Sequence, residues 1–355
     1  MKRAGFLFEK AFAPESLYQA WIDASKGKNN KRATLEFARN LGPNLDALHR
    51  ELHAGNYRPQ PYTEFTVYEP KQRIIYAPAF RDLVVQHAIY RLIYPLFNAS
   101  FIDQSFACRV AKGTHAAADY AQAALRACHP ESYLLQLDVR KFFYSIDRSI
   151  LQTLIERKVK DARFVGVMMQ FANYGPVVGI PIGNLLSQLY ALIYLNPLDH
   201  FIKRTLGAQH YCRYVDDFVL FGCSRAQCME ALAAIKAFLA SALHLELSRY
   251  TLHKVRRGLN FVGYRTWRST RYLRKHSLYT FTKSACKGRL QSVISILGHA
   301  RHTGSHAHLL KTLKGKHHDL FNRLPQSYRQ RYHPQLEAAH RASQPASRAR
   351  ACHPA

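Results

Sequence analysis

Acidic residues are scarce in this 355-residue sequence. It contains 23 Asp and Glu against 51 Lys and Arg, which gives a formal net charge of +28 at pH 7. Such an excess goes beyond what solubility requires and is typical of proteins that bind nucleic acid through its phosphates. The 21 Tyr and 20 Phe add flat faces on which bases can stack. The composition therefore favours a nucleic acid over a membrane surface as the partner.

Long apolar segments and paired cysteines are also missing. No run of about 18 apolar residues occurs, so no membrane-spanning helix is expected. Glu9 and Lys10 interrupt the apolar residues 5–8, which are too few for the core of a signal peptide. The seven cysteines are odd in number and contain no Cys-x₂-Cys pair, which indicates reduced thiols. We therefore expect a cytoplasmic protein with no membrane partner.

Three of the few acids follow apolar segments. Asp216 and Asp217 lie between residues 211–213 and 218–221, at the tip of a predicted β-hairpin. Taken alone, such a pair is usually a solvated turn, because Asp favours turns. Asp138, however, follows the apolar residues 133–137 and adds a third carboxylate at a strand end. Three converging carboxylates can hold two Mg²⁺ ions, which require hard oxygen ligands.

Two such ions would favour a particular reaction. One metal activates an attacking 3′-hydroxyl, and both stabilise the in-line displacement at the α-phosphate of a nucleotide. The acids therefore predict nucleotidyl transfer.

The motifs around these acids, and their order, resemble those of the reverse transcriptases. The palm motifs and the primer-gripping hairpin of that family are similar to residues 137–143 (LDVRKFF), 179–188 (GIPIGNLLSQ), 214–217 (YVDD) and 261–264 (FVGY). Finger motifs of bacterial and group II-like reverse transcriptases are similar to residues 73–75, 80–88 and 108–115. Several uncommon sequence motifs occur here in the same order as in that family, which makes the resemblance specific.

The resemblance covers about residues 60–310 and implies an α+β fold of the right-hand polymerase type. Such a fold has fingers, a palm made of an antiparallel sheet backed by helices, and a helical thumb. The expected parts are an N-terminal helical extension (1–60), fingers (61–125), a palm with the primer-grip hairpin (126–275), a helical thumb (276–340) and a disordered basic tail (341–355). Within the palm, helical spacing predicts a helix over residues 185–195 that Pro197 ends.

The family pattern also implies roles for single residues. Asp138, Asp216 and Asp217 would be catalytic and, with Val139, would hold two Mg²⁺ ions, for which Mn²⁺ can substitute. The expected nucleotide-binding residues are Lys71, Arg73, Phe143, Gly183, Gln188 and Arg249, and the expected primer grip is Phe261, Gly263 and Tyr264.

Phe143 and Gly183 have specific expected functions within this set. Phe143 is similar to the steric gate that rejects a 2′-hydroxyl by clash, whereas the alternative is a core aromatic like Phe142. Gly183 is expected to let the backbone approach the template or the incoming base. Ser187 and Gln188 would add polar contacts at the start of the same helix.

Two positions depart from the family pattern. Ile182 stands where many reverse transcriptases carry Gln, a replacement typical of diversity-generating retroelement enzymes, which copy a template repeat with frequent errors at adenine. Losing the amide would weaken polar checking of the base pair, so Ile182 and Ser187 are the expected template and fidelity residues. Arg249 lies near the family's Lys that is thought to protonate pyrophosphate. Arg stays protonated, so catalysis should be slow unless Lys254 takes that role.

The sequence thus predicts an RNA-directed DNA polymerase of the diversity-generating type. Its expected partners are template RNA, an RNA–DNA duplex and dNTPs, with a basic accessory protein of the retroelement as a further candidate. Only Asp319 and Glu337 follow residue 270, too few acids for an RNase H domain with its own two metals. The alternatives are a phage-defence or retron reverse transcriptase acting on its own RNA, and a catalytically idle RNA-binding scaffold.

Overall fold

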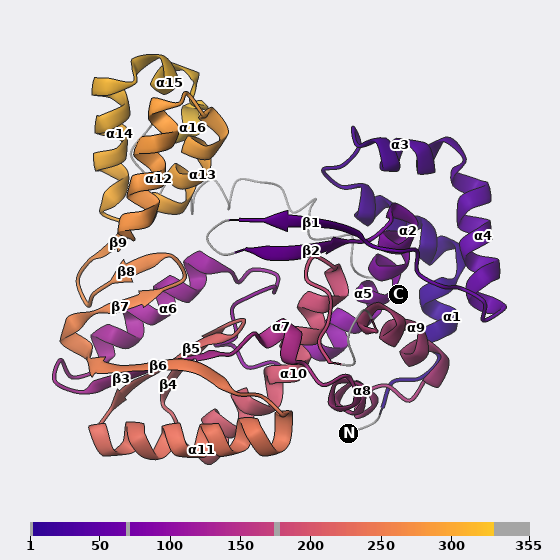
Figure 1. The fold of residues 1–355 in the computed structure, drawn as a ribbon, viewed down its shortest axis with the longest axis horizontal. Helices are drawn as coiled ribbons and strands as arrows, with labels where there is room; N and C mark the ends of the chain where they lie inside the picture. The colour runs from indigo at the N-terminus through magenta and orange to yellow at the C-terminus, as the bar shows by residue number, and fades with distance from the viewer. Residues whose placement is uncertain (1–2, 69–71, 174–177, 330–355) are drawn as a thin grey trace. The chain divides into compact units, whose positions relative to one another are not determined.

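The computed structural model describes residues 3–68, 72–173 and 178–329, which divide into two compact units (Figure 1). The first unit contains residues up to 120 and residues 127–255, and the second contains residues 121–126 and 256–329. Lys71 and the expected tail at 341–355 lie outside the described residues.

The first unit is organised around a four-stranded antiparallel sheet with the strand order β4-β5-β3-β6. Its strands are β3 (Tyr133–Val139), β4 (His210–Tyr214), β5 (Asp217–Cys223) and β6 (Leu247–Lys254). The central strand β3 alternates between the core and the open face, with Leu135 and Leu137 buried and Gln136 and Asp138 half-buried. The expected antiparallel sheet backed by helices is therefore confirmed.

Helices make up most of the rest of this unit, and a separate hairpin is formed by β1 (Thr63–Val67) and β2 (Arg73–Ala77). The helices are α1 (Leu7–Phe12), α2 (Pro14–Ser25), α3 (Arg32–Arg39), α4 (Leu41–His53), α5 (Phe80–Asn98), α7 (Phe142–Ser145), α8 (Arg148–Glu156), α9 (Ala162–Ala172), α10 (Leu185–His200), the π-helix η1 (Phe201–Thr205) and α11 (Arg225–Leu243). Helix α6 (Thr114–Ala127) contributes residues to both units.

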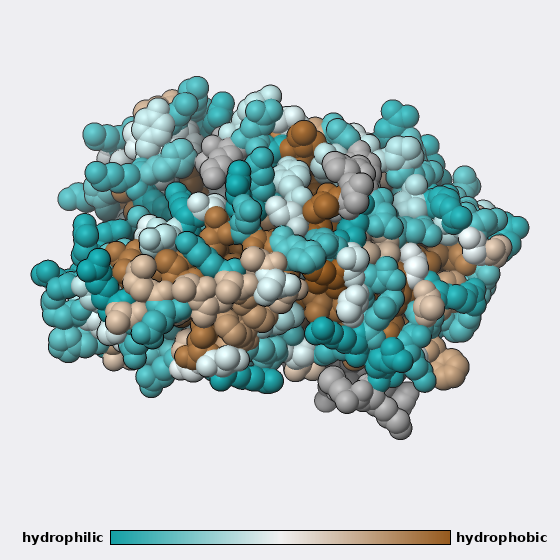
Figure 2. Space-filling view, turned by 60° about the horizontal axis from the view of Figure 1, so that its bottom comes forward, coloured by the Kyte–Doolittle hydropathy of each residue, from teal (hydrophilic) through white to brown (hydrophobic). Residues whose placement is uncertain are grey.

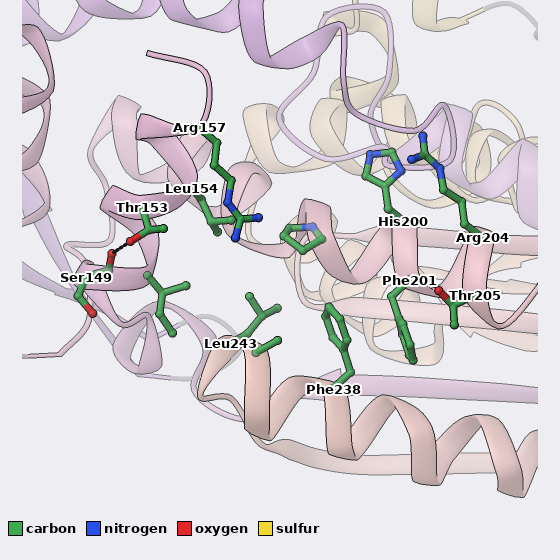
Figure 3. Close-up of a pocket in the computed structure, with 13 residues that line it drawn as sticks. Ser149, Thr153, Leu154, Arg157, His200, Phe201, Arg204, Thr205, Phe238 and Leu243 are labelled. Carbon is green, nitrogen blue, oxygen red and sulfur yellow. Dashed lines mark hydrogen bonds between the residues drawn. The ribbon is translucent and has the colours of Figure 1, made fainter. Parts of the chain in front are cut away.

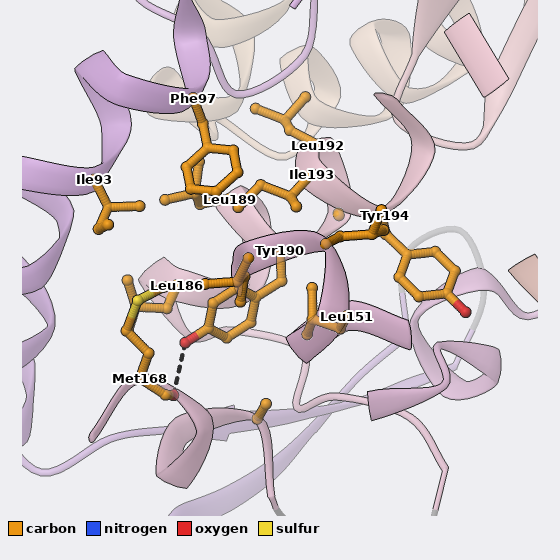
Figure 4. Close-up of a cluster of buried hydrophobic side chains, with 14 of the residues drawn as sticks. Ile93, Phe97, Leu151, Met168, Leu186, Leu189, Tyr190, Leu192, Ile193 and Tyr194 are labelled. Carbon is orange, nitrogen blue, oxygen red and sulfur yellow. Dashed lines mark hydrogen bonds between the residues drawn. The ribbon is translucent and has the colours of Figure 1, made fainter. Parts of the chain in front are cut away.

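Helix α10 lies in the middle of the hydrophobic core. Every side chain from Leu189 to Leu195 is buried, so the helix is covered on all sides, as expected of a central helix. Figure 4 shows Tyr190 of α10 among apolar side chains that include Leu151 and Met168. The Tyr190 hydroxyl is buried there and donates a hydrogen bond of 2.7 Å to the Met168 carbonyl.

The expected end of this helix at Pro197 is wrong, because α10 continues to His200 and leads into η1. A proline inside a helix removes one backbone hydrogen bond and costs about 3 kcal/mol. Leu195 and Leu198, on either side of Pro197, are both fully buried. Burial of each such side chain is worth about 1.5 to 3 kcal/mol, which offsets the cost of the proline.

Helix α11 covers one face of the sheet (Figure 1). It begins with a capping box, in which the Ser224 side chain accepts from the Gln227 backbone and the Gln227 side chain accepts from that of Ser224. Its buried side chains recur at three- and four-residue spacing: Cys228, Leu232, Ile235, Leu239 and Leu243.

The outer side of α11 is apolar as well, with Met229, Ala233, Ala237 and Ala240 exposed. Figure 2 shows apolar side chains gathered over this helix. Among the described residues, α11 alone has the length and hydropathy of a membrane span. One such helix is weak evidence for a membrane, and its buried stripe is the pattern of a helix packed on a sheet.

The second unit combines a small sheet with a group of helices. Its strands β7 (Leu259–Phe261), β8 (Tyr264–Thr266) and β9 (Arg271–Leu273) are antiparallel neighbours in that order. The 3₁₀-helix η2 (Val255–Arg257) precedes them, and the helices that follow are α12 (Lys275–Cys286), α13 (Leu290–Ala300), α14 (Ser305–Lys316), α15 (His318–Arg323) and α16 (Gln326–Arg329). The hairpin of residues 261–264 therefore belongs to the same compact unit as these helices.

The buried hydroxyl of Tyr190 gives a test of this core. Tyr190→Phe removes the donor and with it the second hydrogen bond of the Met168 carbonyl, which keeps its backbone partner within helix α9, so we expect the free energy of unfolding to fall by about 1 kcal/mol. Urea denaturation followed by circular dichroism measures the change. Tyr18→Phe, at an exposed position of α2, is the control and should leave the midpoint unchanged. Equal midpoints for Tyr190→Phe and wild type would contradict the assigned packing.

Candidate active site

A tight turn between β4 and β5 presents two of the three predicted aspartates. Tyr214 pairs with Asp217, so only Val215 and Asp216 connect the two strands. Val215 adopts the left-handed conformation with φ of 57°, which is unusual for a β-branched residue. The predicted position of Asp216 and Asp217 at a hairpin tip is confirmed.

The third aspartate lies on the neighbouring strand at the same end of the sheet. Asp138 of β3 is the direct cross-strand partner of Asp217 on β5. Such partners have Cβ atoms about 4.5 to 5.5 Å apart on one face of the sheet. The Val139 N–H donates to the Asp216 carbonyl at 3.2 Å, which ties β3 to the turn. Sheet pairing therefore places Asp138 beside Asp217 and next to the turn that carries Asp216, while the convergence of all three carboxylates on one ion stays a prediction.

The surroundings of Asp216 are electrostatically unfavourable for a carboxylate. Burial raises its pKa above the usual value, and the nearby charge of Asp138 raises it further. Arg73 of β2 and Arg213 of β4 act in the opposite direction and lower it. Arg73, a predicted nucleotide-binding residue, is therefore close enough to the acids to influence them.

The two candidate proton donors occupy opposite ends of β6. Arg249 is paired with Asp138, and its Nε lies 4.0 Å from Asp138 Oδ2. Lys254 is paired with Tyr133 and forms a 2.6 Å ion pair with Glu131. The idea that Lys254 replaces the expected lysine is therefore wrong, because Lys254 is five steps along an extended strand from Arg249, or about 17 Å.

The donor set suits a hard divalent cation. Two neighbouring carboxylates, one of them with a raised pKa, form a concentration of negative charge that such a cation would neutralise. Asp217 Oδ1 meanwhile accepts from the Gln136 side chain at 2.9 Å. Within the described residues, no group of three or more His, Cys, Asp or Glu side chains is arranged to hold a metal ion. A cation shared by all three aspartates would therefore require their side chains to turn toward one another.

Asn184 is a structural residue of the site that the sequence analysis missed. It is fully buried, and its side-chain oxygen accepts from the backbone N–H groups of Leu186 and Ser187 at the start of α10. Its amide donates to the Tyr62 hydroxyl at 2.8 Å and to the Phe171 carbonyl at 3.2 Å. The available signal was an Asn directly before a predicted helix, which is a preferred N-cap.

The loop before α10 packs against β2. The Tyr76 N–H donates to the Ile182 carbonyl at 2.7 Å. Gly183 has φ of 110°, and a Cβ placed there would lie 2.6 Å from Cγ2 of Ile75. The close approach that requires Gly183 in this structure is to β2, and its expected approach to the template or base stays a prediction. Ile182 itself is half-buried in this loop.

The two polar residues in the first turn of α10 differ in exposure. Ser187 is only 1% exposed, so in this structure its hydroxyl cannot contact a template. Its expected role as a template contact is corrected, since the side chain faces the core. Gln188 is exposed and remains available to a ligand.

The adjacent rings of Phe142 and Phe143 have different environments. Phe142 is 2% exposed and packs in the core, whereas Phe143 is half-buried. Their ring centroids lie 5.5 Å apart in an edge-to-face arrangement. The Phe143 carbonyl accepts from the Ile180 N–H at 2.8 Å, which fixes it beside the loop that leads to α10. Phe143 thus differs from the core residue Phe142 in being partly accessible to solvent.

The predicted primer-grip residues lie in the second unit. Phe261 and Tyr264 are buried, and the Tyr264 hydroxyl donates to the His299 carbonyl at 2.8 Å. A Cβ on Gly263 would lie 2.5 Å from Cε1 of His299, so the turn packs against α13. The rings of Phe261 and Tyr264 therefore stabilise the hairpin from within, and its role as a primer grip stays a prediction. Val262 and Gly263 at its tip are half-buried and are the more accessible residues of this hairpin.

A pocket of about 600 Å³ lies elsewhere on the first unit, between α8, the end of α10 and α11 (Figure 3). It combines Arg157, His200 and Arg204 with the rings of Phe201 and Phe238, which stack with centroids 4.4 Å apart. None of the predicted site residues lines it. We therefore assign the chemistry to the strand ends and not to this pocket.

Comparison with known proteins identifies a family whose members are similar to this chain. A family model described as reverse transcriptase (RNA-dependent DNA polymerase) matches residues 68–266. Protein YkfC of Escherichia coli K12 is 25% identical over 314 residues, which are 74% of this chain and 82% of YkfC. The group II intron-encoded protein LtrA of Lactococcus lactis is 25% identical over 211 residues, which are 55% of this chain but only 35% of LtrA.

Solved structures of telomerases are also similar. The telomerase of Candida albicans, in complex with a fragment of telomeric RNA, has a TM-score of 0.48 at 12% identity, over 75% of this chain and 55% of that one. The apo telomerase of Candida tropicalis has a TM-score of 0.49 at 10% identity, over 75% of this chain and 59% of that one.

The raised pKa of Asp216 predicts that this residue destabilises the protein when no cation is bound. A carboxyl with a raised pKa in the folded state opposes folding once it is ionised, and this penalty disappears as the pH falls toward the unfolded pKa of about 3.9. Asp216→Asn should therefore raise the melting temperature at pH 7 in EDTA, and the difference should shrink toward pH 4.

Differential scanning calorimetry across this pH range measures the effect. Asp46→Asn, which removes an exposed carboxylate of α4, should change the melting temperature little at any of these pH values. A lower melting temperature for Asp216→Asn at pH 7 would show that the carboxylate stabilises the fold, contrary to the expectation.

Proposed function

The chain belongs to the reverse transcriptase family, whose model matches more than half of its residues, and we propose that it makes cDNA by two-metal nucleotidyl transfer in a diversity-generating retroelement. As a member it is an RNA-directed DNA polymerase, and its fold is of the right-hand type with the β4-β5-β3-β6 sheet as the palm. The proposed chemistry rests mainly on one observation, the cross-strand pairing of Asp138 with Asp217 beside the turn that carries Asp216.

The proposed mechanism assigns a separate task to each charged residue near the turn. The aspartates would hold the divalent cations, Mg²⁺ or Mn²⁺, which when bound activate the 3′-hydroxyl and stabilise the displacement at the α-phosphate. Arg73, whose charge reaches Asp216, would contact the triphosphate through its planar fork of donors. Arg249 beside Asp138 would bind the leaving pyrophosphate but would protonate it poorly.

Selection of the sugar is proposed to depend on Phe143. The ring is half-buried beside the loop that leads to α10, whereas Phe142 fills the core. A bulky ring at this place would discriminate against a 2′-hydroxyl by clash and not by attraction. Gln188, exposed on the first turn of α10, is a further proposed nucleotide contact.

The nucleic-acid partners are proposed to be template RNA and the RNA–DNA duplex. Asp319 is the only acid in the described residues 256–329, so the second unit is strongly cationic. Such a surface suits the phosphates of an A-form duplex, which proteins recognise mainly through shape and backbone. We propose a cytoplasmic location, and a basic accessory protein of the retroelement remains a candidate partner.

The retroelement type rests on Ile182. Its backbone is fixed by the hydrogen bond to Tyr76 of β2, while its half-buried side chain has no polar group to offer a base pair. A phage-defence or retron enzyme with its own RNA shares the other motifs and is the second candidate. The idle scaffold is disfavoured, because all three aspartates are present and two of them pair directly across the sheet.

Replacing Asp138 or Asp216 tests the polymerase assignment. Asp138→Asn and Asp216→Asn each remove a charged oxygen ligand, so primer extension on an RNA template should fall by more than about a hundredfold. Residues that only hydrogen-bond to a metal ligand already cost up to about a hundredfold when they are replaced, and loss of the ligand itself should cost more. RNA affinity, measured by filter binding, should change little. Asp46→Asn serves as the matched control on an exposed surface. Extension at the wild-type rate by either active-site variant would refute the mechanism.

The fidelity of copying tests the retroelement type. Ile182→Gln adds one polar group near the templating base, and a net hydrogen bond of about 1 kcal/mol corresponds to a roughly fivefold gain in discrimination. Misincorporation should fall most opposite template adenine, as read by sequencing of the cDNA. Ile182→Val keeps an apolar side chain and should leave the error rate unchanged. If wild-type protein copies adenine as accurately as other bases, the phage-defence or retron candidate takes first place.

A further inference from the structure

An ion pair is buried directly behind the turn of Val215 and Asp216. Asp199 of α10 is 0% exposed and Arg213 of β4 is 1% exposed in their side chains. Arg213 Nε donates to Asp199 Oδ1 at 2.7 Å, and a second nitrogen of the guanidinium donates to Oδ2 at 2.5 Å. The Tyr211 hydroxyl adds a third hydrogen bond of 2.7 Å to Asp199 Oδ1. The carboxylate is thus fully satisfied by two residues of one strand.

The remaining guanidinium nitrogen of Arg213 contacts the turn itself. Its Nη1 donates to the Val215 carbonyl at 2.9 Å. Val215 has φ of 57°, and holding a β-branched residue in this region is strained, so surrounding contacts must impose it. The bond from Arg213 is such a contact, because it fixes the carbonyl of the strained residue.

The backbone of Arg213 is held from the opposite side. Its N–H donates to the Gln104 carbonyl at 3.0 Å, and its carbonyl accepts from the Phe106 N–H at 3.0 Å. Strand β4 is therefore anchored on a loop as well as on β5. With Arg213 fixed in both backbone and side chain, Val215 has a rigid partner.

We propose that Asp199 and Arg213 are positioning residues that hold the Val215 turn in its left-handed conformation, so that Asp216 and Asp217 are ready to bind a divalent cation. The inference rests on the proposed metal-dependent function. Stability alone is a poor reason for such a pair, because a buried ion pair often contributes no more than apolar residues of similar size. A role in fixing one conformation of the turn is consistent with the hydrogen bond from Nη1 of Arg213 to the Val215 carbonyl.

Binding of Mn²⁺ to the protein alone tests the proposal without any catalytic readout. Electron paramagnetic resonance of free Mn²⁺ gives the dissociation constant for wild type, Tyr211→Phe and Arg213→Lys. Loss of a hydrogen bond to a charged group should weaken Mn²⁺ binding by about tenfold. Tyr211→Phe is the milder change and keeps the experiment informative where Arg213→Lys folds poorly. Affinities equal to wild type in both variants would overturn the proposal.

Another buried tyrosine supplies a closely matched control. The Tyr57 hydroxyl donates to Asp82 Oδ1 at 2.7 Å, and Asp82 is 1% exposed, but this pair does not contact the turn. Tyr57→Phe should lower the unfolding midpoint as much as Tyr211→Phe while leaving the Mn²⁺ affinity unchanged. Equal loss of Mn²⁺ affinity in the two variants would mean a general effect of stability and would overturn the positioning role.

A rescue experiment distinguishes positioning from a merely structural effect. Gly adopts the left-handed region without strain, so Val215→Gly in the Arg213→Lys background should recover part of the lost Mn²⁺ affinity. No recovery would count against the proposal. Asp216→Asn should abolish tight Mn²⁺ binding in any background. If Asp216→Asn binds Mn²⁺ like wild type, the metal assignment itself fails, which is a result distinct from failure of the positioning pair.

Discussion

The register between β3 and β5 is the constraint on which the rest of the site depends. It places Asp138 opposite Asp217, and a slip of one residue would move Asp138 to the other face of the sheet. Leu135 and Leu137 prevent such a slip, because they are fully buried and occupy the opposite face of the same strand. The hydrophobic core thus sets the positions of the aspartates that are proposed to be catalytic.

The same pairing creates an electrostatic cost. Asp216 is partly buried beside Asp138, and burial raises its pKa most. Arg73 of the β1–β2 hairpin and Arg213 of β4 both reduce this cost. Two cationic side chains near Asp216 therefore limit the rise in its pKa.

Local patterns predicted the acids well because strand alternation and turn chemistry act over a few residues. Asp138 and the hairpin tip at Asp216 were found in this way. Longer-range contacts explain what the sequence did not reveal. Phe261 and Tyr264 match a motif, but packing within the second unit buries their rings. In the sequence, nothing distinguishes Arg213 from the many other basic residues. Only the fold brings it to Asp199, fourteen residues away along the chain.

Helix α10 connects the two halves of the site that the sequence analysis treated separately. Its first turn is capped by Asn184, which follows the loop of Ile182 that is bonded to β2. Near its other end Asp199 holds Arg213 and, through it, the Val215 turn. The intervening residues are almost all buried, so the helix is a rigid spacer of about 22 Å at 1.5 Å per residue. One buried helix therefore positions both the loop that is bonded to β2 and the turn that carries Asp216, and the continuation of α10 through Pro197 is required for Asp199 to reach Arg213.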